Sequence, residues 1–166
     1  MPFWLGRRRR KAGGRREIVE ALATVRQARF KLKVYKSRLH MLESEDAERL
    51  ASRLEYIDYI LEAVGLRLET ILALQPSIEA VEDLMKLPYE LVKQAAKQAQ
   101  DLPPDITSLL TALEQSLASA IPEDTLIELG PGPETLSPQA RDILREAEKR
   151  AGEAASKRVR EQQGMQ

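Results

Sequence analysis

An unbroken apolar repeat in the middle of the chain restricts its fold more than any other feature. From Ala47 to Ile71, apolar residues recur at alternating spacings of three and four residues. This period of about 3.5 residues predicts a long helix over 44–75, packed in coiled-coil fashion. Glu55 and Glu62 fall outside the seam of this helix. The large seam residues are Leu50, Leu54, Ile57, Leu61, Val64 and Leu68.

A second apolar stripe precedes this helix and predicts a partner for it. We expect a first helix from about Arg16 to Leu42, in which Arg29 and Lys36 take two stripe positions and Phe30 lies beside the stripe. A short connection ending at the N-cap Ser44 separates the two periodic runs, which predicts an antiparallel hairpin. The apolar stripe residues are Ile18, Leu22, Val25, Leu32, Leu39 and Leu42.

Prolines divide the remainder of the chain. After a break at Pro76, shorter apolar stripes are expected on either side of Pro88, and Asp105 is expected to cap a further helix. Residues 122–137 are rich in proline and glycine and predict a flexible linker. The fold class is therefore all-α, with an N-terminal segment 1–15, a hairpin 16–75, shorter helices 77–121, the linker and a C-terminal helix within 138–166.

Charge is distributed unevenly along the chain, although the formal net charge is zero. Residues 7–40 contain 13 basic and 2 acidic side chains, whereas residues 43–90 contain 4 basic and 12 acidic ones. A basic first third offers a face to an anionic partner, and it can also attract an acidic middle in the same or another molecule. We therefore expect side-by-side assembly into filaments, with the basic first helix of one subunit near the acidic middle of another.

The chain begins MPFWLGRRRRKAGGRR, an apolar cluster followed by cations. We interpret it as a membrane anchor, with the apolar side chains in the interface and the cations on anionic headgroups. Gly13-Gly14 would be its hinge. The proposed membrane-binding residues are Phe3, Trp4, Leu5, Arg7, Arg8, Arg9, Arg10, Lys11, Arg15 and Arg16.

Two other function classes compete with a membrane role. The same cations would neutralise nucleic-acid phosphates, although the chain offers no recognised motif and few aromatic residues to stack on bases. A plain coiled-coil scaffold is the third interpretation. We expect no enzyme and no cofactor, because there is one histidine, no cysteine and no phosphate-binding glycine loop. No run of about 20 apolar residues predicts a membrane span.

The most telling segment is YIDYILEAVGLRLETILALQPSIEAVEDLMKLPYELVKQAAKQAQDLPPDITSLLTALEQSLASA. With the basic and acidic hairpin helices around it, this segment resembles the ESCRT-III superfamily, and its LRLET stretch looks like the archaeal CdvB branch. The likeness covers about 16–120.

The resemblance implies a cytoplasmic polymer that remodels anionic membranes in cell division or vesicle budding, peripheral on the inner face of the cell membrane. Its partners would be further copies, related ESCRT-III subunits and a AAA+ disassembly ATPase. The resemblance also implies a final helix that folds back as a brake on assembly. The apolar stripe of this helix is mainly alanine, so its large apolar anchors would be Ile143 and Leu144.

Overall fold

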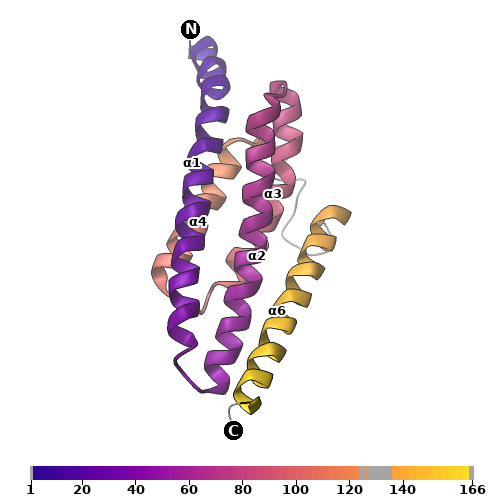
Figure 1. Ribbon diagram of the computed structural model, residues 1–166. Helices are drawn as coiled ribbons and strands as arrows, with labels where there is room; N and C mark the ends of the chain where they lie inside the picture. The colour runs from indigo at the N-terminus through magenta and orange to yellow at the C-terminus, as the bar shows by residue number, and fades with distance from the viewer. Residues whose placement is uncertain (1, 124–125, 127–135, 165–166) are drawn as a thin grey trace.

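The computed structural model describes residues 2–123, 126 and 136–164, with the side chains of 2–14, 158–159 and 161–163 outside the described part. All regular structure in these ranges is helical and forms five helices, which confirms the all-α fold class. Figure 1 shows the helices arranged side by side along one long direction. Most of the expected linker 122–137 lies outside the described residues.

The hairpin consists of α1 (Pro2–Leu39) and α2 (Glu45–Leu74). Ser44 is the N-cap of α2, as predicted, and its hydroxyl accepts a hydrogen bond from the backbone N–H of Ala47 at 3.1 Å. The prediction for α1 was wrong at both ends. The helix begins at Pro2 and ends before Leu42, which is exposed in the connection.

The backbone of residues 2–15 therefore belongs to α1 and is not a separate segment. The helix also continues through Gly13 and Gly14, where we expected a hinge. A physical reason is that arginine and lysine are good helix formers. The seven that surround the two glycines favour continuation, although glycine itself disfavours a helix.

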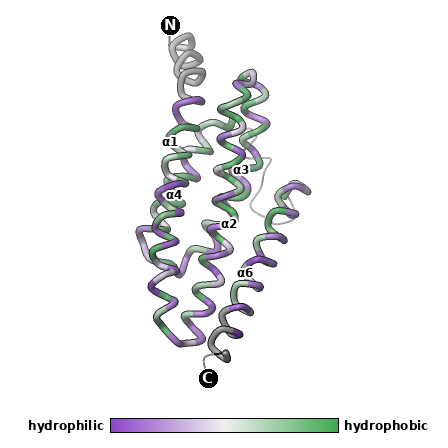
Figure 2. Tube along the Cα trace, viewed as in Figure 1, coloured by the Kyte–Doolittle hydropathy of each residue, from purple (hydrophilic) through white to green (hydrophobic). Residues whose placement is uncertain are grey.

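The predicted seam of α2 is confirmed by burial. Leu54, Ile57, Leu61, Val64 and Leu68 are all buried, while Leu50 is partly buried against the same core. On α1, the stripe is buried at Ile18, Leu22, Val25 and Leu32 and partly buried at Leu39. Figure 2 shows hydrophobic residues recurring along each of the helices, as this packing requires.

Two shorter helices complete the bundle. α3 (Ile78–Gln98) continues through the buried Pro88, so the two stripes expected on either side of this proline belong to one helix. Pro88 costs one helical hydrogen bond, but the apolar residues on both sides of it share one buried face. α4 (Pro104–Ser119) has Pro103 as its N-cap, and Asp105 lies in its first turn instead of capping it.

The four helices form a bundle in which neighbours in sequence lie side by side. α1 packs against α2 and α4, and α3 packs against α2 and α4. The last helix, α6 (Pro138–Gly164), lies along α2 on the outside of this bundle and also contacts α3 (Figure 1). The fold thus places α2 at the centre, with α1 on one side and α6 on another.

Candidate functional site

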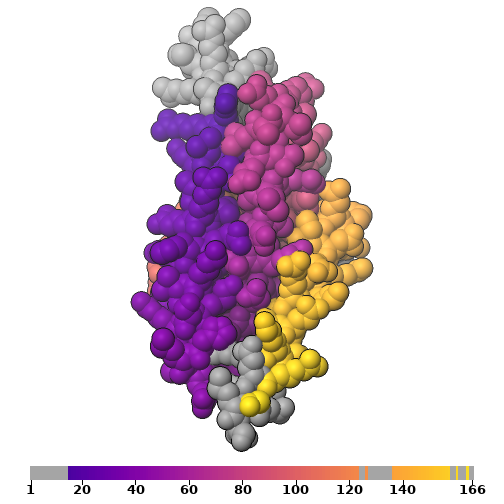
Figure 3. All heavy atoms as spheres, in the orientation of Figure 1, coloured from indigo at the N-terminus to yellow at the C-terminus, as the bar shows by residue number. Residues whose placement is uncertain are grey.

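The side of α1 that faces away from the bundle exposes apolar residues among cations. Val19 is 52% exposed and Phe30 is 68% exposed, and they lie about three helical turns apart on one side of the helix. Figure 3 shows this helix along one side of the molecule. We call the outer α1 face the exposed residues Arg15, Arg16, Val19, Ala23, Arg26, Phe30 and Lys33.

The cations of this face lie on both sides of its apolar residues. Successive helical residues are about 100° apart, so Arg26 and Lys33 lie on one flank of Val19 and Phe30, and Arg16 lies on the other. Arg16 pairs with Glu20 at 3.2 Å and Arg26 with Glu69 at 3.5 Å, both on the surface. Exposed pairs of this kind contribute about 0–1 kcal/mol, so an anionic partner can replace them at little cost.

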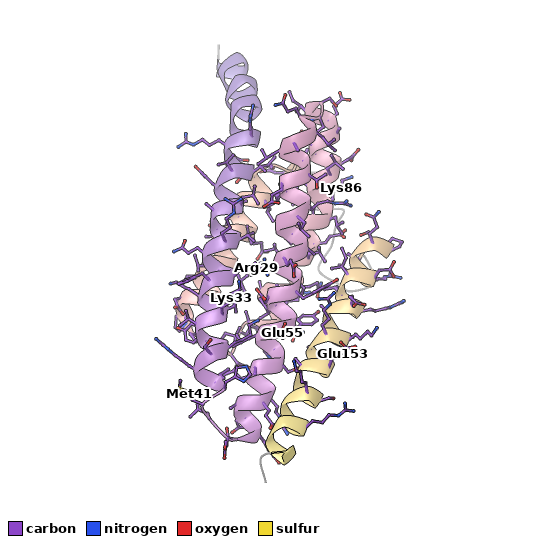
Figure 4. All side chains as sticks on the ribbon, in the orientation of Figure 1. Arg29, Lys33, Met41, Glu55, Lys86 and Glu153 are labelled. Carbon is purple, nitrogen blue, oxygen red and sulfur yellow. The ribbon has the colours of Figure 1, made fainter. Side chains whose placement is uncertain are left out.

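Sequence reasoning missed Phe30 and Val19 as surface residues. The sequence pattern places Phe30 beside the buried stripe, but in the structure its side chain is exposed to solvent. The signal was available, because Val19, Ala23 and Phe30 share one helical face opposite to the buried Leu32. At the hairpin connection, Met41 is exposed as well and lies at the end of the hairpin in Figure 4.

The predicted membrane-binding residues divide into two groups. Arg15 and Arg16 are exposed and belong to the outer α1 face. The side chains of the other eight, from Phe3 to Lys11, lie outside the described residues, although their backbone belongs to α1. The structure therefore joins the outer α1 face and the N-terminal residues in one helix.

On its inner side, α1 is tied to α2 by a cluster of charged groups. Arg29 Nε donates to Asp58 Oδ1 at 2.9 Å, and Lys36 Nζ lies 3.2 Å from Asp58 Oδ2. Lys36 also contacts Glu55 at 2.9 Å, and Arg29 lies 3.8 Å from Glu62. Figure 4 shows Arg29 between the two helices. The two cations that interrupt the α1 stripe are thus matched by carboxylates, one of which, Asp58, is only 7% exposed.

This cluster holds its cations in the charged form. Burial by itself lowers the pKa of Lys36, but the hydrogen bond to Glu55 and the charges of Asp58 and Glu55 outweigh it and raise the pKa. The pKa of Arg29 is raised in the same way, because its contact with Asp58 outweighs burial. Arg29 and Lys36 therefore stay charged at neutral pH, and their contacts with α2 fix the register of α1 against it.

A smaller polar contact ties α1 to α4. The Tyr35 hydroxyl lies 3.0 Å from Asp105 Oδ2, and Lys31 Nζ lies 3.5 Å from the same oxygen. Burial raises the pKa of Asp105, but the hydrogen bond from Tyr35 and the charge of Lys31 outweigh it, so the pKa is lowered. The hydrogen bond to Asp105 raises the pKa of Tyr35. Asp105 thus connects two helices instead of capping one.

The contact between α6 and the bundle is built mainly from alanine. Among the described side chains of α6, Ala140, Ala147 and Ala151 are buried, whereas Ile143 and Leu144, the expected anchors, are partly buried against the core. Because alanine buries little area, this interface is shallow. The structure confirms that the final helix lies on the core, but small residues carry its closest packing.

Polar and aromatic contacts supplement these alanines. The Arg150 guanidinium lies 4.7 Å from the centre of the Tyr59 ring, and the Ser52 hydroxyl donates to the backbone carbonyl of Ala151 at 3.1 Å. At the start of α6, Glu90 accepts a hydrogen bond from Ser137 at 2.9 Å. The Arg150 contact is a cation–π contact between a basic residue of α6 and an aromatic ring of α2.

Comparisons with known proteins provide no relative for this arrangement. No family model, no curated protein and no solved structure matches the chain. Among the described residues, none of the helices combines the length and the apolar content needed to cross a membrane.

Proposed function

We propose that this protein is an ESCRT-III-like subunit that binds anionic membranes through α1 and assembles there into filaments. The observation that carries the proposal is the outer α1 face, where Val19 and Phe30 are exposed between cations. An interface of anionic lipid offers both of the environments that such a face needs. Phosphates attract the cations, and the acyl boundary accepts the apolar side chains.

The magnitudes favour reversible binding by one subunit and firm binding by many. Each lysine or arginine near an anionic surface contributes about 1 kcal/mol, reduced by salt. Full burial of Phe30 would add at most about 1.5–3 kcal/mol. Several subunits joined in a filament would multiply these terms through effective concentration. Assembly and membrane binding would therefore reinforce each other.

Other parts of the proposal follow from the resemblance. The protein would be cytoplasmic and peripheral, would need no cofactor and would have no catalytic activity. Related subunits and a AAA+ ATPase would be its partners, in cell division or vesicle budding. The packing of α6 along α2 supports a role as a brake, since α6 covers a side of the central helix α2 that its release would expose.

Vesicle flotation tests the membrane proposal. We expect the protein to float with anionic vesicles and not with neutral ones, and the double change Val19→Ala and Phe30→Ala to weaken binding about tenfold or more. Leu74→Ala is a matched control, because Leu74 is equally exposed but lies at the end of α2. Equal binding to neutral vesicles, or no loss in the double variant, would contradict the proposal.

The same variants separate membrane from nucleic acid. A nucleic-acid binder would lose affinity when Arg26 and Lys33 are changed to Gln, and it would tolerate the loss of Val19 and Phe30. A membrane binder is expected to be weakened by both sets of changes. If the protein binds a DNA duplex and this binding depends on the cations alone, the outer α1 face is a nucleic-acid interface.

A further inference from the structure

A cavity opens at the end of the bundle where α1 enters and α2 ends. Its volume is about 670 Å³, which lies within the range of about 300–1,000 Å³ found for ligand pockets. The apolar part of its wall comes from all four helices of the bundle and the residues after α4. This part includes Ile18, Ile71, Leu72, Val81, Ala118 and Ile121.

The chain itself leads from this cavity to an apolar segment. Arg15 lines the cavity, so the residues before it leave the bundle beside the opening. They are Gly13 and Gly14, then the basic run, then Phe3, Trp4 and Leu5. A cavity of this size can accept two aromatic side chains and a leucine.

We propose that Phe3, Trp4 and Leu5 dock in this cavity of their own chain when no membrane is present. In the structure, α1 continues through both glycines. The docked arrangement is a second state, in which the helix begins after them. Glycine is the poorest helix former after proline, so the pair is the weakest point of this part of α1. The nine residues 6–14 reach about 30 Å when extended, which is ample for a return to the opening.

Charge complementarity favours this occupant over a neutral one. The cavity lining includes the carboxylates of Glu82 and Glu123 with the guanidinium of Arg15, and the first turn of α3 also carries Glu79. A returning N-terminus would bring the basic run 7–11 close to these carboxylates. The same five cations would leave them for lipid phosphates on a membrane.

Docking would keep the membrane anchor in the cavity until an anionic surface competes for it. This consequence rests on the proposed function. The docking itself is a property of the protein in solution. It can therefore be tested without vesicles, and its failure would leave the membrane proposal untouched.

Trp4 is the only tryptophan in the chain and reports its own environment. In the full-length protein without lipid, we expect blue-shifted emission and quenching by acrylamide that is severalfold slower than for a free tryptophan amide. Emission and quenching equal to those of the free amide would overturn the proposal. Protection that disappears on dilution would also overturn it, because the occupant would then come from a second copy.

Two variants and one control assign any protection to the cavity. Ile78→Glu places a carboxylate in the wall at a residue that is 47% exposed and at a helix start that favours acids, so folding should be retained. Gly13→Ala with Gly14→Ala should strengthen the helix and hold the N-terminus out. Both should expose Trp4, whereas Leu74→Glu, at a residue 67% exposed outside the cavity, should not. Equal protection in all of these proteins would contradict docking in this cavity.

Anionic vesicles with brominated acyl chains complete the test. Transfer of Trp4 from the cavity to the membrane predicts bromine quenching, with a faster onset in Ile78→Glu than in the unchanged protein. Bromine quenching without prior protection in solution would support the anchor and reject the stored state. Protection in solution without bromine quenching would support docking and reject the anchor.

Discussion

α2 packs against α1 and against α6 with residues of very different size. The hairpin buries Leu54, Ile57, Leu61 and Leu68 of α2 almost completely. The α6 interface, in contrast, buries alanines of α6 and leaves Ile143 and Leu144 partly exposed. Each buried methylene contributes about 0.8 kcal/mol, so leucine positions stabilise far more than alanine positions.

This difference indicates which contact holds the fold and which can be given up. The seam and the cluster around Asp58 tie α1 to α2 with both large apolar groups and buried charges. α6 is held by small residues, a cation–π contact and a few hydrogen bonds. The comparison predicts that α6 can leave while the hairpin stays intact.

The largest expected loss of stability comes from a substitution that leaves a cavity in the α2 seam. Leu61→Ala should lower the free energy of unfolding by about 2–5 kcal/mol, because the deletion leaves space that the packed core fills only in part. Leu144→Ala in α6 is the comparison and should cost less than about 1.5 kcal/mol, since that side chain is only partly buried. Urea unfolding followed by circular dichroism measures both. Similar losses of unfolding free energy in the two variants would show that the α1 and α6 interfaces do not differ in strength.

Substitutions in the charged cluster around Asp58 should give the next largest loss of stability. Asp58→Ala leaves Arg29 and Lys36 without their shared partner and should cost about 2–3 kcal/mol. Glu55→Ala should cost about 1 kcal/mol, because Glu55 is 2.9 Å from Lys36. Glu62→Ala should cost about 0–0.5 kcal/mol, because its pair is longer, at 3.8 Å, and more exposed. The same urea measurements test this order, and equal costs at the three positions would contradict it.

Removal of α6 should change assembly more than stability. Truncation after Ile121 keeps the four-helix bundle, so we expect faster and more extensive polymerisation by light scattering at equal concentration. Ala147→Glu provides a full-length control, because a carboxylate at this buried position should release α6 without shortening the chain. Unchanged assembly in both proteins would reject the brake and leave α6 as a spacer or a recruiting segment.

The smallest expected effect concerns pH. The pKa of Asp105 is lowered in the folded protein, so its contribution is present above the ordinary carboxyl pKa of about 4. It is lost as the pH falls through the lowered folded value. Tyr35→Phe removes one cause of the shift, so unfolding free energy should depend less steeply on pH below about 4 than in the unchanged protein. Urea unfolding at several acid pH values compares them, and parallel curves would contradict this role for Tyr35.

Long-period features of the fold were predictable from the sequence. The heptad repeat placed the α2 seam, and Ser44 marked the start of α2. The proline at position 76 marked the turn after α2, where Gln75 adopts a left-handed φ of 46°. These features depend on local spacing and capping, which a single sequence displays directly.

The features that the sequence pattern left open, or for which it suggested a different role, depend on tertiary context. Pro88 is accommodated because α3 is buried on both sides of it, and Asp105 is drawn to Tyr35 and Lys31 of another helix. The pairing of Arg29 and Lys36 with Asp58 likewise required the register of the hairpin. Phe30 is a different case. Helical periodicity alone places it on the outer face of α1, but a large apolar side chain is usually assigned to the buried stripe.

Electron microscopy of the purified protein with and without vesicles tests the central claim most directly. If the outer α1 face serves anionic membranes, filaments should cover anionic vesicles at moderate salt and be sparse on neutral vesicles or in solution. They should weaken at about 1 M salt, where the Debye length is about 3 Å. Protein that coats anionic vesicles without forming filaments, or filaments that form equally without lipid and persist at high salt, would contradict the account.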